Sequence, residues 1–508
     1  MPSEIGCYHL PIEAADGLAE RSFGKLTLLL TLEERAADFR VLDCFDQSLR
    51  RSGRLLLETG GSLELFMADG RVLSQPTHHA ARFVADLQEG PVKQALADVS
   101  PLRSLLPVGS GNLRRAAFAL LDSGEKTHCR AHLRMMTDTG GAGAVLLTLQ
   151  GLRGYDRSLA ALREQIEACG GVELSCGGLY AALFPGQVAY TAKPEVIVAP
   201  DDTSLDAANT IISTYIPVAR ANEAGIIADL DTEFLHDFRV VLRKIRSVLS
   251  IFKGVYAKHQ TTELKTKFAK LMEPTGRLRD LDVYLLERQK FYDLVPKTLH
   301  SGLDIMFKLF AEQRRAEFAK LARHLHSKSY QKDISQLAKL FHKRKKLKAG
   351  AKADRKAHDY ACGLIWKRYS RVRKITARIG PETDDAEVHA LRIQCKKLRY
   401  LMAFFRPIFP KTEFKSLIKP LKELQDSLGL FNDYSVQQAS LQDFLHKASD
   451  WPNAVSLAVA QSVGALTAVL HHRQINERTK VIQSFARFND PAMQETFQNL
   501  FHRREDKT

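Results

Sequence analysis

The spacing of apolar residues divides the chain at about residue 200 into two regions. In the first region, short apolar runs are bounded by Gly, Asp or Ser, which is the pattern of strands joined by tight turns. In the second, apolar residues recur at every third or fourth position over long stretches, which is typical of amphipathic helices. The expected strands are 26–32, 39–42, 54–58, 63–67 and 144–149, and the expected helices are 205–221, 230–254, 260–290, 298–326, 330–346, 355–379, 384–406, 412–447 and 453–486.

Residues that break regular structure mark the joins between these elements. Gly60-Gly61 and Asp69-Gly70 are expected to form hairpin turns. The segment 193–204 combines two prolines with a candidate helix N-cap, and it predicts a linker into the helical region. The predicted organisation is a mixed α+β domain followed by an all-α antiparallel helical bundle, with the divisions 1–192, 193–204 (linker), 205–500 and 501–508 (tail).

One helical pattern, His-x-x-Arg-x-x-x-basic-basic-x-Arg, occurs twice in the second region. At about 100° per residue, its positions 0, 3, 7 and 10 share one helix face, and the opposite face is apolar in both copies. Each helix is therefore expected to pack by one side and to present a row of cations, here called a ridge, on the other. The residues are His236, Arg239, Arg243 and Arg246 of the first ridge with the adjoining Lys244, and His389, Arg392, Lys396 and Arg399 of the second ridge with the adjoining Lys397.

Neither ridge contains a carboxylate. An ordinary solvated helix face alternates Glu with Lys at positions i and i+4, which stabilises the helix and cancels its charge. Like charges stacked one turn apart cost stability unless an anion binds among them. Because the pattern returns after 153 residues, a chance solvated face is a poor explanation, and the ridges are expected to bind a polyanion.

Further motifs repeat at the same interval. Gly276-Arg-Leu-Arg279-Asp280 aligns with Gly429-Leu-Phe-Asn432-Asp433, and 44 residues separate each aspartate from the histidine of its ridge. The helical domain is therefore expected to be a duplication, with repeats at about 205–350 and 351–500. Asp280 and Asp433 are expected to hold Arg side chains by buried ion pairs. Metal binding by these aspartates with His236 and His389 is disfavoured, because the neighbouring cations would repel a divalent ion.

The charge distribution supports a polyanionic partner. The whole chain of 508 residues has a formal net charge of +16, but residues 1–200 hold 20 Lys and Arg against 23 Asp and Glu, which leaves 54 against 35 in residues 201–508. Such an asymmetry predicts that the helical region meets nucleic acid, a phospholipid surface or a phosphate polymer.

Cysteine usage and the N-terminal sequence suggest a location. The seven cysteines form no Cys-x-x-Cys pair, which argues against a disulfide framework or a zinc ribbon and favours a reducing cytoplasm. No secretory signal pattern is visible at the N-terminus. The stretch 451–472 lacks a formal charge over a membrane-spanning length, but its polar residues favour a helix buried among other helices, so no membrane contact is expected.

One segment of the first region resembles a known family. Val41-Leu-Asp43-Cys-Phe-Asp46-Gln-Ser-Leu49-Arg50-Arg51-Ser-Gly53 is similar to a motif of CYTH domains, the triphosphate tunnel metalloenzymes, and Gly151-Leu-Arg-Gly154-Tyr155 is similar to the place where such domains end. The resemblance implies a β-barrel tunnel. Those enzymes open with Glu-x-Glu-x-Lys, whose carboxylates hold a metal that binds a triphosphate. The corresponding Glu4-Ile-Gly6-Cys-Tyr8 keeps one residue of three, so a degenerate domain without a metal is expected.

The second region resembles the CHAD domain. The similarity covers about 205–500 and lies in the two ridges, in Arg279-Asp280-x-Asp-Val and in Leu424-Gln425-Asp426-x-Leu-Gly429-x-x-Asn432-Asp433. It implies two four-helix halves around a basic central pore, and binding of inorganic polyphosphate. CHAD domains often follow a CYTH domain in one bacterial chain, so each resemblance supports the other.

The expected function is non-catalytic binding of inorganic polyphosphate by the ten ridge and adjoining residues, without cofactor or metal. Interior phosphates only accept hydrogen bonds, which suits donor-only Arg and Lys. An alternative is a CYTH-type triphosphatase or polyphosphatase to which the helical domain delivers substrate; no P-loop and no Ser or Cys nucleophile with a paired base is visible. A second alternative is a nucleic-acid-binding module, which the scarcity of aromatic residues on the ridges disfavours. The expected location is the cytoplasm, with polyphosphate granules as a candidate place, and homo-oligomerisation is left open.

Overall fold

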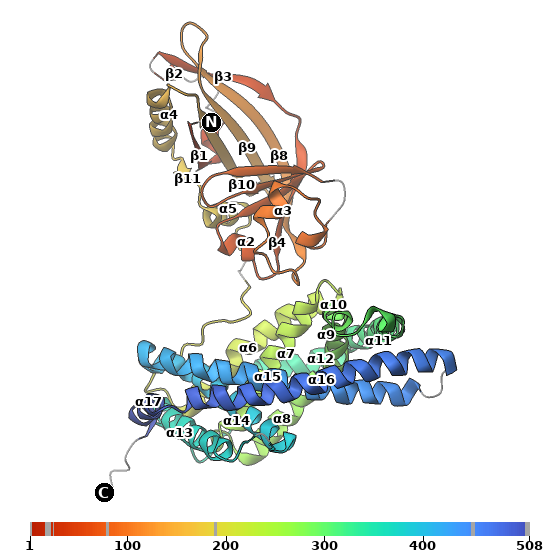
Figure 1. Cartoon of the computed structure of the whole chain (residues 1–508). Coiled ribbons are helices and arrows are strands. Elements are labelled where there is room, and N and C mark those ends of the chain that lie inside the picture. Colours follow the sequence, from red (N-terminus) through yellow and green to blue (C-terminus); the bar gives the residue numbers. More distant parts are fainter. Residues whose placement is uncertain are drawn as a thin grey trace. The chain divides into compact units, whose positions relative to one another are not determined.

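The computed structural model describes residues 3–15, 22–23, 25–77, 81–186, 190–380, 382–448 and 453–502. The chain divides into two compact units, Met1–Ala192 and Lys193–Thr508 (Figure 1). Each unit is described by itself. The first is an α+β fold and the second is helical, as the hydrophobic pattern predicts.

The N-terminal unit is built on one curled antiparallel sheet (Figure 1). Within the described residues the strand order is β11-β1-β10-β9-β8-β4-β5-β6-β7, and β3 pairs with β8 and β2 off this path. The strands are β1 (Ser3–Leu10), β2 (Ser22–Phe23), β3 (Leu26–Glu33), β4 (Ala37–Cys44), β5 (Leu55–Thr59), β6 (Ser62–Phe66), β7 (Val72–Pro76), β8 (Leu105–Leu121), β9 (Thr127–Asp138), β10 (Gly143–Gly151) and β11 (Val172–Glu173).

The sequence pattern missed the longest strand of this sheet. β8 runs for 17 residues. Its part from Gly111 to Leu121 pairs with β9, while its other edge pairs first with β4 and then with β3. Pro107, Gly109 and Gly111 interrupt its apolar alternation, and Gly111 is needed because a Cβ there would lie 2.0 Å from the carbonyl oxygen of Thr137. β8 thus holds the two halves of the sheet together.

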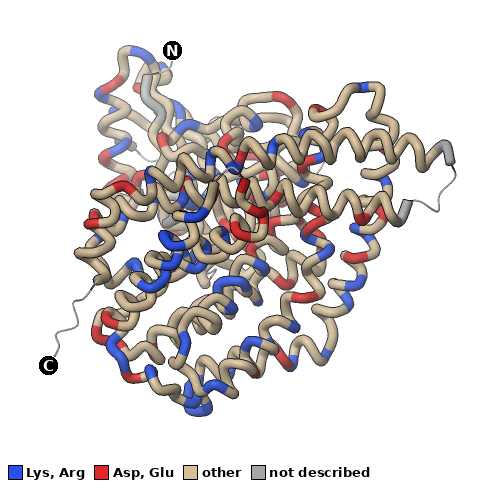
Figure 2. Tube along the Cα trace, turned by 60° about the horizontal axis from the view of Figure 1, so that its bottom comes forward, with Lys and Arg blue, Asp and Glu red and all other residues tan. Residues whose placement is uncertain are grey.

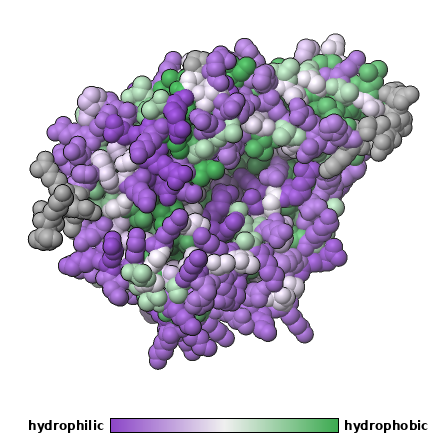
Figure 3. All heavy atoms as spheres, turned by 90° about the horizontal axis from the view of Figure 1, so that it is seen from below, coloured by the Kyte–Doolittle hydropathy of each residue, from purple (hydrophilic) through white to green (hydrophobic). Residues whose placement is uncertain are grey.

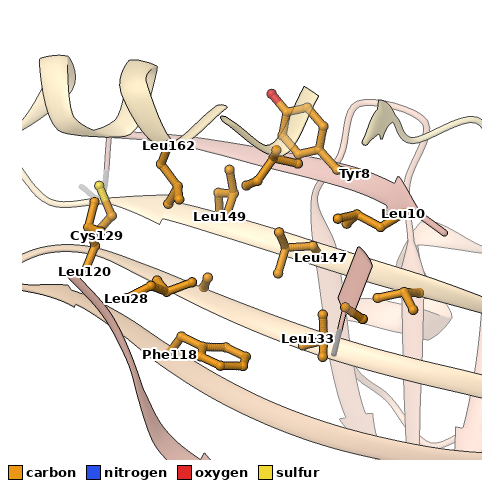
Figure 4. Packing of buried hydrophobic residues seen from close by; sticks show 14 of the residues in the cluster. Tyr8, Leu10, Leu28, Phe118, Leu120, Cys129, Leu133, Leu147, Leu149 and Leu162 are labelled. Atoms are coloured by element: carbon orange, nitrogen blue, oxygen red, sulfur yellow. The ribbon is translucent and has the colours of Figure 1, made fainter. Parts of the chain in front are cut away.

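Short helices cover both faces of the sheet. They are α1 (Ile12–Ala15), α2 (Ser48–Arg51), η1 (Val84–Asp86), α3 (Pro91–Ala95), α4 (Asp156–Ala168) and α5 (Cys176–Leu183). Helix α4 buries Leu159, Leu162 and Ile166 against one face, in a core that includes Leu147 and Leu149 (Figure 4). The opposite face packs against Leu179 and Leu183 of α5. Because successive strand residues point to opposite faces, this division fixes where each side chain of β9 points.

The helical unit contains long amphipathic helices (Figure 1). They are α6 (Ser204–Ile227), α7 (Thr232–Ile251), α8 (Lys258–Met272), η2 (Glu273–Thr275), α9 (Gly276–Leu286), α10 (Arg288–Tyr292), η3 (Lys297–Leu299), α11 (His300–His326), α12 (Lys328–Lys343), α13 (Ala357–Thr376), α14 (Asp385–Phe405), η4 (Arg406–Ile408), α15 (Lys411–Ala448), α16 (Asn453–Phe488) and α17 (Pro491–Phe501).

The helix starts repeat with a constant interval. Helices α6, α7, α8 and α11 begin 153 residues before α13, α14, α15 and α16, respectively: the pairs of first residues are Ser204 and Ala357, Thr232 and Asp385, Lys258 and Lys411, and His300 and Asn453. This is the same interval that separates the two ridges in the sequence. Helices α7 and α14, which carry the two ridges, form one of these four pairs.

Helix α16 includes a stretch, Val455–Phe488, that is long and apolar enough to cross a membrane by length and composition alone. Within the described residues it is the single helix with this property, and 28% of its most apolar window is buried. One face packs through Val459, Val463 and Leu466 into a core shared with α11. Leu457 is 60% exposed on another face. The expectation of a helix buried among other helices is thus correct for one face only, and the preceding residues 451–452 lie outside the described part.

Candidate cationic site on α7 and α14

The first ridge lies on α7, which begins at a strong N-cap. The Asp231 side chain accepts hydrogen bonds from the backbone N–H groups of Glu233 and Phe234 at 2.9 and 3.2 Å, which satisfies donors that the first turn leaves free. The apolar face is fully buried through Phe238, Val241 and Ile245. As the periodicity predicts, all four ridge side chains of α7 lie outside this core and are half-buried.

The second ridge lies on α14 and is packed in the same way. Leu391, Cys395, Leu398, Met402 and Phe405 are completely buried. Arg392 and Lys396 are half-buried, whereas His389 and Arg399 are exposed. The two helices are in contact, and near their C-terminal ends the ring of Phe252, which follows α7, stacks on Phe405 with the centroids 5.1 Å apart.

The two ridges act on each other electrostatically. Desolvation lowers the pKa of Arg392 and of Lys396, and the charge of Arg243 from the first ridge lowers both further. Arg399 of the second ridge acts in the same direction on Lys244, after the larger effect of desolvation. The structure therefore brings cations from α7 and α14 together, although they are 153 residues apart in the sequence.

Each ridge is held by the segment that follows at the predicted interval. Arg279 of α9 donates to Nδ1 of His236 at 3.0 Å, and Nη1 of Arg239 donates to the Thr275 hydroxyl at 2.5 Å. In the second ridge, Nδ1 of His389 lies 2.7 Å from Oδ1 of Asn432 on α15. The motifs that repeat in the sequence thus meet in space, each against its own ridge.

Two guanidinium groups of the site retain an unused donor. The Nε–H groups of Arg239 and Arg392 are buried, and neither has a hydrogen-bond partner among the described residues. A buried donor without a partner costs free energy. The guanidinium groups themselves are suited to an anion, because guanidinium and phosphate geometry match.

Two lysines of the site, Lys244 and Lys396, have pKa values far below the ordinary value of a lysine. Desolvation, with the repulsion of Arg392 and Arg243, lowers the pKa of Lys396 to about 8. Desolvation, with the repulsion of Lys193 and Arg399, also lowers the pKa of Lys244 to about 8. Lys244 additionally donates to the Tyr215 hydroxyl at 3.1 Å and lies 4.4 Å from the centre of that ring. Both lysines are charged at neutral pH and lose their charge within two pH units above it.

Lys397 does not lie among the cations that α7 and α14 bring together. It is the neighbour of Lys396 in the sequence, but the charges that act on it come from α13, α8 and the end of α7, namely Arg368, Arg371, Lys253 and Lys265. A single residue turns a helix by about 100°, which takes Lys397 off the ridge face. The other nine predicted residues lie on the two ridges or directly beside them.

The expectation that Asp280 and Asp433 form buried ion pairs is wrong. The Asp433 side chain is 62% exposed, and its Oδ1 lies 3.9 Å from Nη2 of Arg392; Asp280 is also exposed. The buried carboxylate is Asp282, which accepts from Nε of Arg314 at 2.8 Å. Asp229 completes this pair by a two-pronged contact with the same guanidinium, at 2.6 Å for each bond. Sequence reasoning missed Asp229 because no motif surrounds it.

The N-terminal unit contains a polar cavity of about 400 Å³ beside the basic strand β9. Its cations are already paired. Nε of Arg134 donates to Glu64 at 2.9 Å, and Arg115 lies 3.5 Å from Glu34 and 3.6 Å from Glu64. His132 also lines the cavity, and desolvation lowers its pKa. The cavity is thus close to charge-balanced, unlike the ridges.

Residues Gly6 and Tyr8 do not face this cavity. Tyr8 packs in the core beneath α4, and a Cβ at Gly6 would lie 3.0 Å from the Tyr8 ring and 3.3 Å from Arg163 of α4. The cavity side of β1 is marked by Cys7, whose Sγ lies 3.9 Å from the Thr148 hydroxyl. The Glu4 side chain lies outside the described residues. A carboxylate at position 6 would therefore point toward α4 rather than into the cavity.

Three other glutamates of this unit were candidates for holding a metal ion at a different place from Glu4. They are Glu33, Glu58 and Glu64, and each is paired with an arginine. Glu33 pairs with Arg114, and Glu58 with Arg40. In the part of the chain that the structure describes, no group of three or more His, Cys, Asp or Glu side chains could hold a metal ion. These three glutamates therefore serve as counter-ions to arginines.

Among the described residues lies a Ser-His-Asp alignment that the sequence did not reveal. Nδ1 of His128 lies 2.9 Å from the Ser158 hydroxyl, and Nε2 lies 3.1 Å from Asp122. Asp122 also accepts the backbone N–H groups of Gly124 and Lys126 in the β8–β9 turn. We assign this set a structural role, because it ties that turn to the first turn of α4.

The distribution of charged residues over the helical unit is consistent with a cationic site (Figure 2). In Figure 2, Lys and Arg positions predominate over Asp and Glu on the helices in the lower part of the view. Figure 3 shows a hollow in the face of the molecule seen from below, with mostly hydrophilic residues around it.

Comparison with known proteins identifies the helical region. The family model of the CHAD domain matches residues 210–442. This part of the chain is a CHAD domain. The matched region includes α7 and α14, and so both ridges of the CHAD domain are inside it.

Two solved structures are similar to this chain. The CHAD domain from the plant Ricinus communis has 23% sequence identity and a TM-score of 0.45, and the match covers 56% of this chain and 97% of that one. PptA from Streptomyces chartreusis has 16% identity and a TM-score of 0.41, with coverages of 58% and 99%. A comparison with curated proteins found no match.

Proposed function

We propose that this protein binds inorganic polyphosphate, without cleaving it, through the two ridges of its CHAD domain. The observation that carries the proposal is the convergence of Arg243 with Arg392 and Lys396. The charge of Arg243 on α7 lowers the pKa of two half-buried cations of α14, Arg392 and Lys396, and such an arrangement is unfavourable until an anion enters it. A linear polymer of phosphates supplies many negative charges and only acceptor oxygens.

The contacts of the ridges favour a phosphate polymer over a nucleic acid. The guanidinium groups of Arg239 and Arg392 are donor-only groups whose geometry matches phosphate oxygens. Two aromatic rings beside the site already face a cation: Tyr215 faces Lys244, and Tyr400 faces Arg399 at 5.8 Å. Non-specific single-strand binders rely on aromatic rings that stack on bases. We therefore propose polyphosphate as the partner in a basic pore between two similar four-helix halves, in the cytoplasm and with polyphosphate granules as a candidate place.

The N-terminal unit supports a non-catalytic role. If it is a degenerate CYTH-like domain, its cavity has exchanged metal-binding carboxylates for Arg–Glu pairs such as Arg134–Glu64. Hydrolysis of a phosphoanhydride ordinarily needs a cation that neutralises the phosphoryl oxygens. The enzyme alternative would require that cation to be held by residues other than those in the cavity.

The proposal is tested by a binding titration of the full-length protein with four ligands at fixed salt: long-chain polyphosphate, tripolyphosphate, ATP and single-stranded DNA. We expect the tightest binding for the long chain, because many weak contacts act together, and a steep loss of affinity as salt is raised. Equal affinity for DNA and polyphosphate would favour the nucleic-acid alternative. Equal affinity for tripolyphosphate and the long chain would contradict a polymer site.

A further inference from the structure

A second group of cations lies on another side of α14. It consists of Lys397 on α14, Arg368 and Arg371 on α13, Lys253 after α7 and Lys265 on α8, and it is here called the α13 cluster. All the charges that act on Lys397 in this group are positive, and desolvation is the largest cause of its lowered pKa. No carboxylate is among the charges that act on Lys397, whereas on the second ridge Asp433 lies 3.9 Å from Arg392.

Several contacts fix these residues in place. Nη1 of Arg368 donates to Oε1 of Gln394, which lies one turn before Lys397 on the same side of α14. The Tyr360 hydroxyl of α13 donates to the backbone carbonyl of Lys253 at 3.0 Å. Phe252, the residue before Lys253, makes an edge contact with Phe404 of α14 at 6.3 Å. Packing therefore holds Lys253, Arg368 and Lys397 near one another.

The α13 cluster also has an unused donor. The Nε–H of Arg368 is buried, and no described residue accepts a hydrogen bond from it. The same feature occurs at Arg239 and Arg392 on the ridges. The buried N–H is costly in itself, and the neighbouring like charges are costly in the absence of an anion.

The two halves differ at this position. Arg368 corresponds to Tyr215 at the interval of 153 residues, as Lys397 corresponds to Lys244. Tyr215 accepts a hydrogen bond from Lys244 and covers it with its ring. In the second half an arginine replaces that tyrosine, so Lys397 faces another cation instead of a neutral partner. The first half closes off its lysine, whereas the second half adds positive charge.

We propose that the α13 cluster is a second phosphate-binding site, which takes up a further stretch of the same polymer and thereby selects long chains over short ones. This inference rests on the proposed polyphosphate binding at the ridges. Lys396 of the ridge and Lys397 of the α13 cluster are adjacent on α14, so a chain that passes around this helix can reach both groups. A short oligophosphate fills the ridges alone.

The test measures the affinity of full-length variants for two ligands, tripolyphosphate and a polyphosphate of about 100 phosphates. Only the long chain can gain affinity from a second site. The double variant Arg368→Gln with Arg371→Gln removes two charges of the α13 cluster. A second double variant, Lys253→Gln with Lys265→Gln, removes two other charges without altering α13. The matched control is Lys308→Gln with Arg323→Gln on α11, where both side chains are exposed.

We expect both cluster variants to bind the long chain about tenfold more weakly and to bind tripolyphosphate within about twofold of the wild type, because multivalent contacts multiply. The control should change neither affinity appreciably, and thermal melting should confirm that every variant is folded. An unchanged affinity for the long chain, an equal loss for both ligands, or an equal loss in the control would overturn the inference while leaving ridge binding intact. If the wild-type protein binds neither ligand, the proposed function itself fails and the inference fails with it.

Discussion

Arg279 donates a hydrogen bond to Nδ1 of His236, with Nη2 and Nδ1 3.0 Å apart. A guanidinium can only donate, so this nitrogen of His236 must accept and the proton of the neutral ring lies on Nε2. In the second ridge the partner is Oδ1 of Asn432, an acceptor 2.7 Å from Nδ1 of His389. There the proton lies on Nδ1. The two equivalent histidines are therefore opposite tautomers.

This relationship can be checked directly. We expect two-dimensional ¹H–¹⁵N spectra of the imidazole rings, recorded at a pH where both are neutral, to show His236 as the Nε2–H form and His389 as the Nδ1–H form. The variant Arg279→Gln, which replaces an obligatory donor with a group that can also accept, should release His236 from its tautomer. His389 should keep its tautomer in that variant. Identical tautomers in the wild-type protein would contradict the assignment.

Polyphosphate affinity should fall as the pH rises from 7 to 9. Lys244 and Lys396 have pKa values of about 8, so both are charged at pH 7 and largely neutral at pH 9, while interior phosphates keep their charge. Titrations at pH 7, 8 and 9 with constant ionic strength measure the change. The variant Lys396→Gln should bind more weakly at pH 7 and show a flatter pH profile. A wild-type profile without a slope would refute the role of these lysines.

The same two lysines should make the free protein more stable as the pH rises. Their pKa in the folded state is about 8, below the ordinary value of 10.5, so the unfolded chain binds more protons between these pH values. Stability then increases with pH over that window, from about 8 toward 10.5. Chemical denaturation at pH 8 and 10 should show the increase for the wild type, and a smaller one for Lys244→Gln with Lys396→Gln.

Removal of ridge charges should weaken binding without unfolding the protein. We expect Arg243→Gln or Arg392→Gln to reduce polyphosphate affinity by about 10- to 100-fold, as expected for the loss of a charged hydrogen bond. The melting temperature should stay the same or rise, because each change relieves repulsion between α7 and α14. A large fall in melting temperature with unchanged binding would show that the ridges are structural.

Asp282 is the residue whose loss should damage the fold. Asp282→Ala leaves Arg314 with one of its two carboxylate partners in a largely buried position, and breaking a buried pair costs about 3–5 kcal/mol. Urea denaturation should show a loss of this order. Asp280→Ala serves as the matched control two residues away, and it should cost far less because its side chain is exposed.

The N-terminal unit should not release phosphate from tripolyphosphate or ATP in a metal-dependent reaction. Its cavity pairs Arg134 and Arg115 with Glu64 and Glu34, which leaves no carboxylate group free to hold magnesium or manganese there. The test incubates the purified protein with tripolyphosphate or ATP in the presence of magnesium or manganese, and it measures the phosphate released. Turnover that EDTA abolishes and that Glu64→Gln reduces would make the protein an enzyme.

The sequence by itself determined the division into an α+β region and a helical region, the two ridges and the repeat of 153 residues. These features depend on local periodicity, because a helix turns by a fixed angle at each residue and a strand alternates its faces. That is why the buried faces of α7 and α14 agree with the prediction. The strand β8 was not predicted, because Pro107, Gly109 and Gly111 disturb its alternation of apolar and polar residues.

Only the tertiary structure decided which charged groups meet. Asp280 and Asp282 are two residues apart on α9, and about 200° of helix rotation separates them, so the position of α11 determined that Asp282 binds Arg314. Lys396 and Lys397 are adjacent in the sequence, yet the packing of α13 gives Lys397 different neighbours. Periodicity places a residue on a face of its own helix, but the helix opposite that face comes from a distant part of the chain.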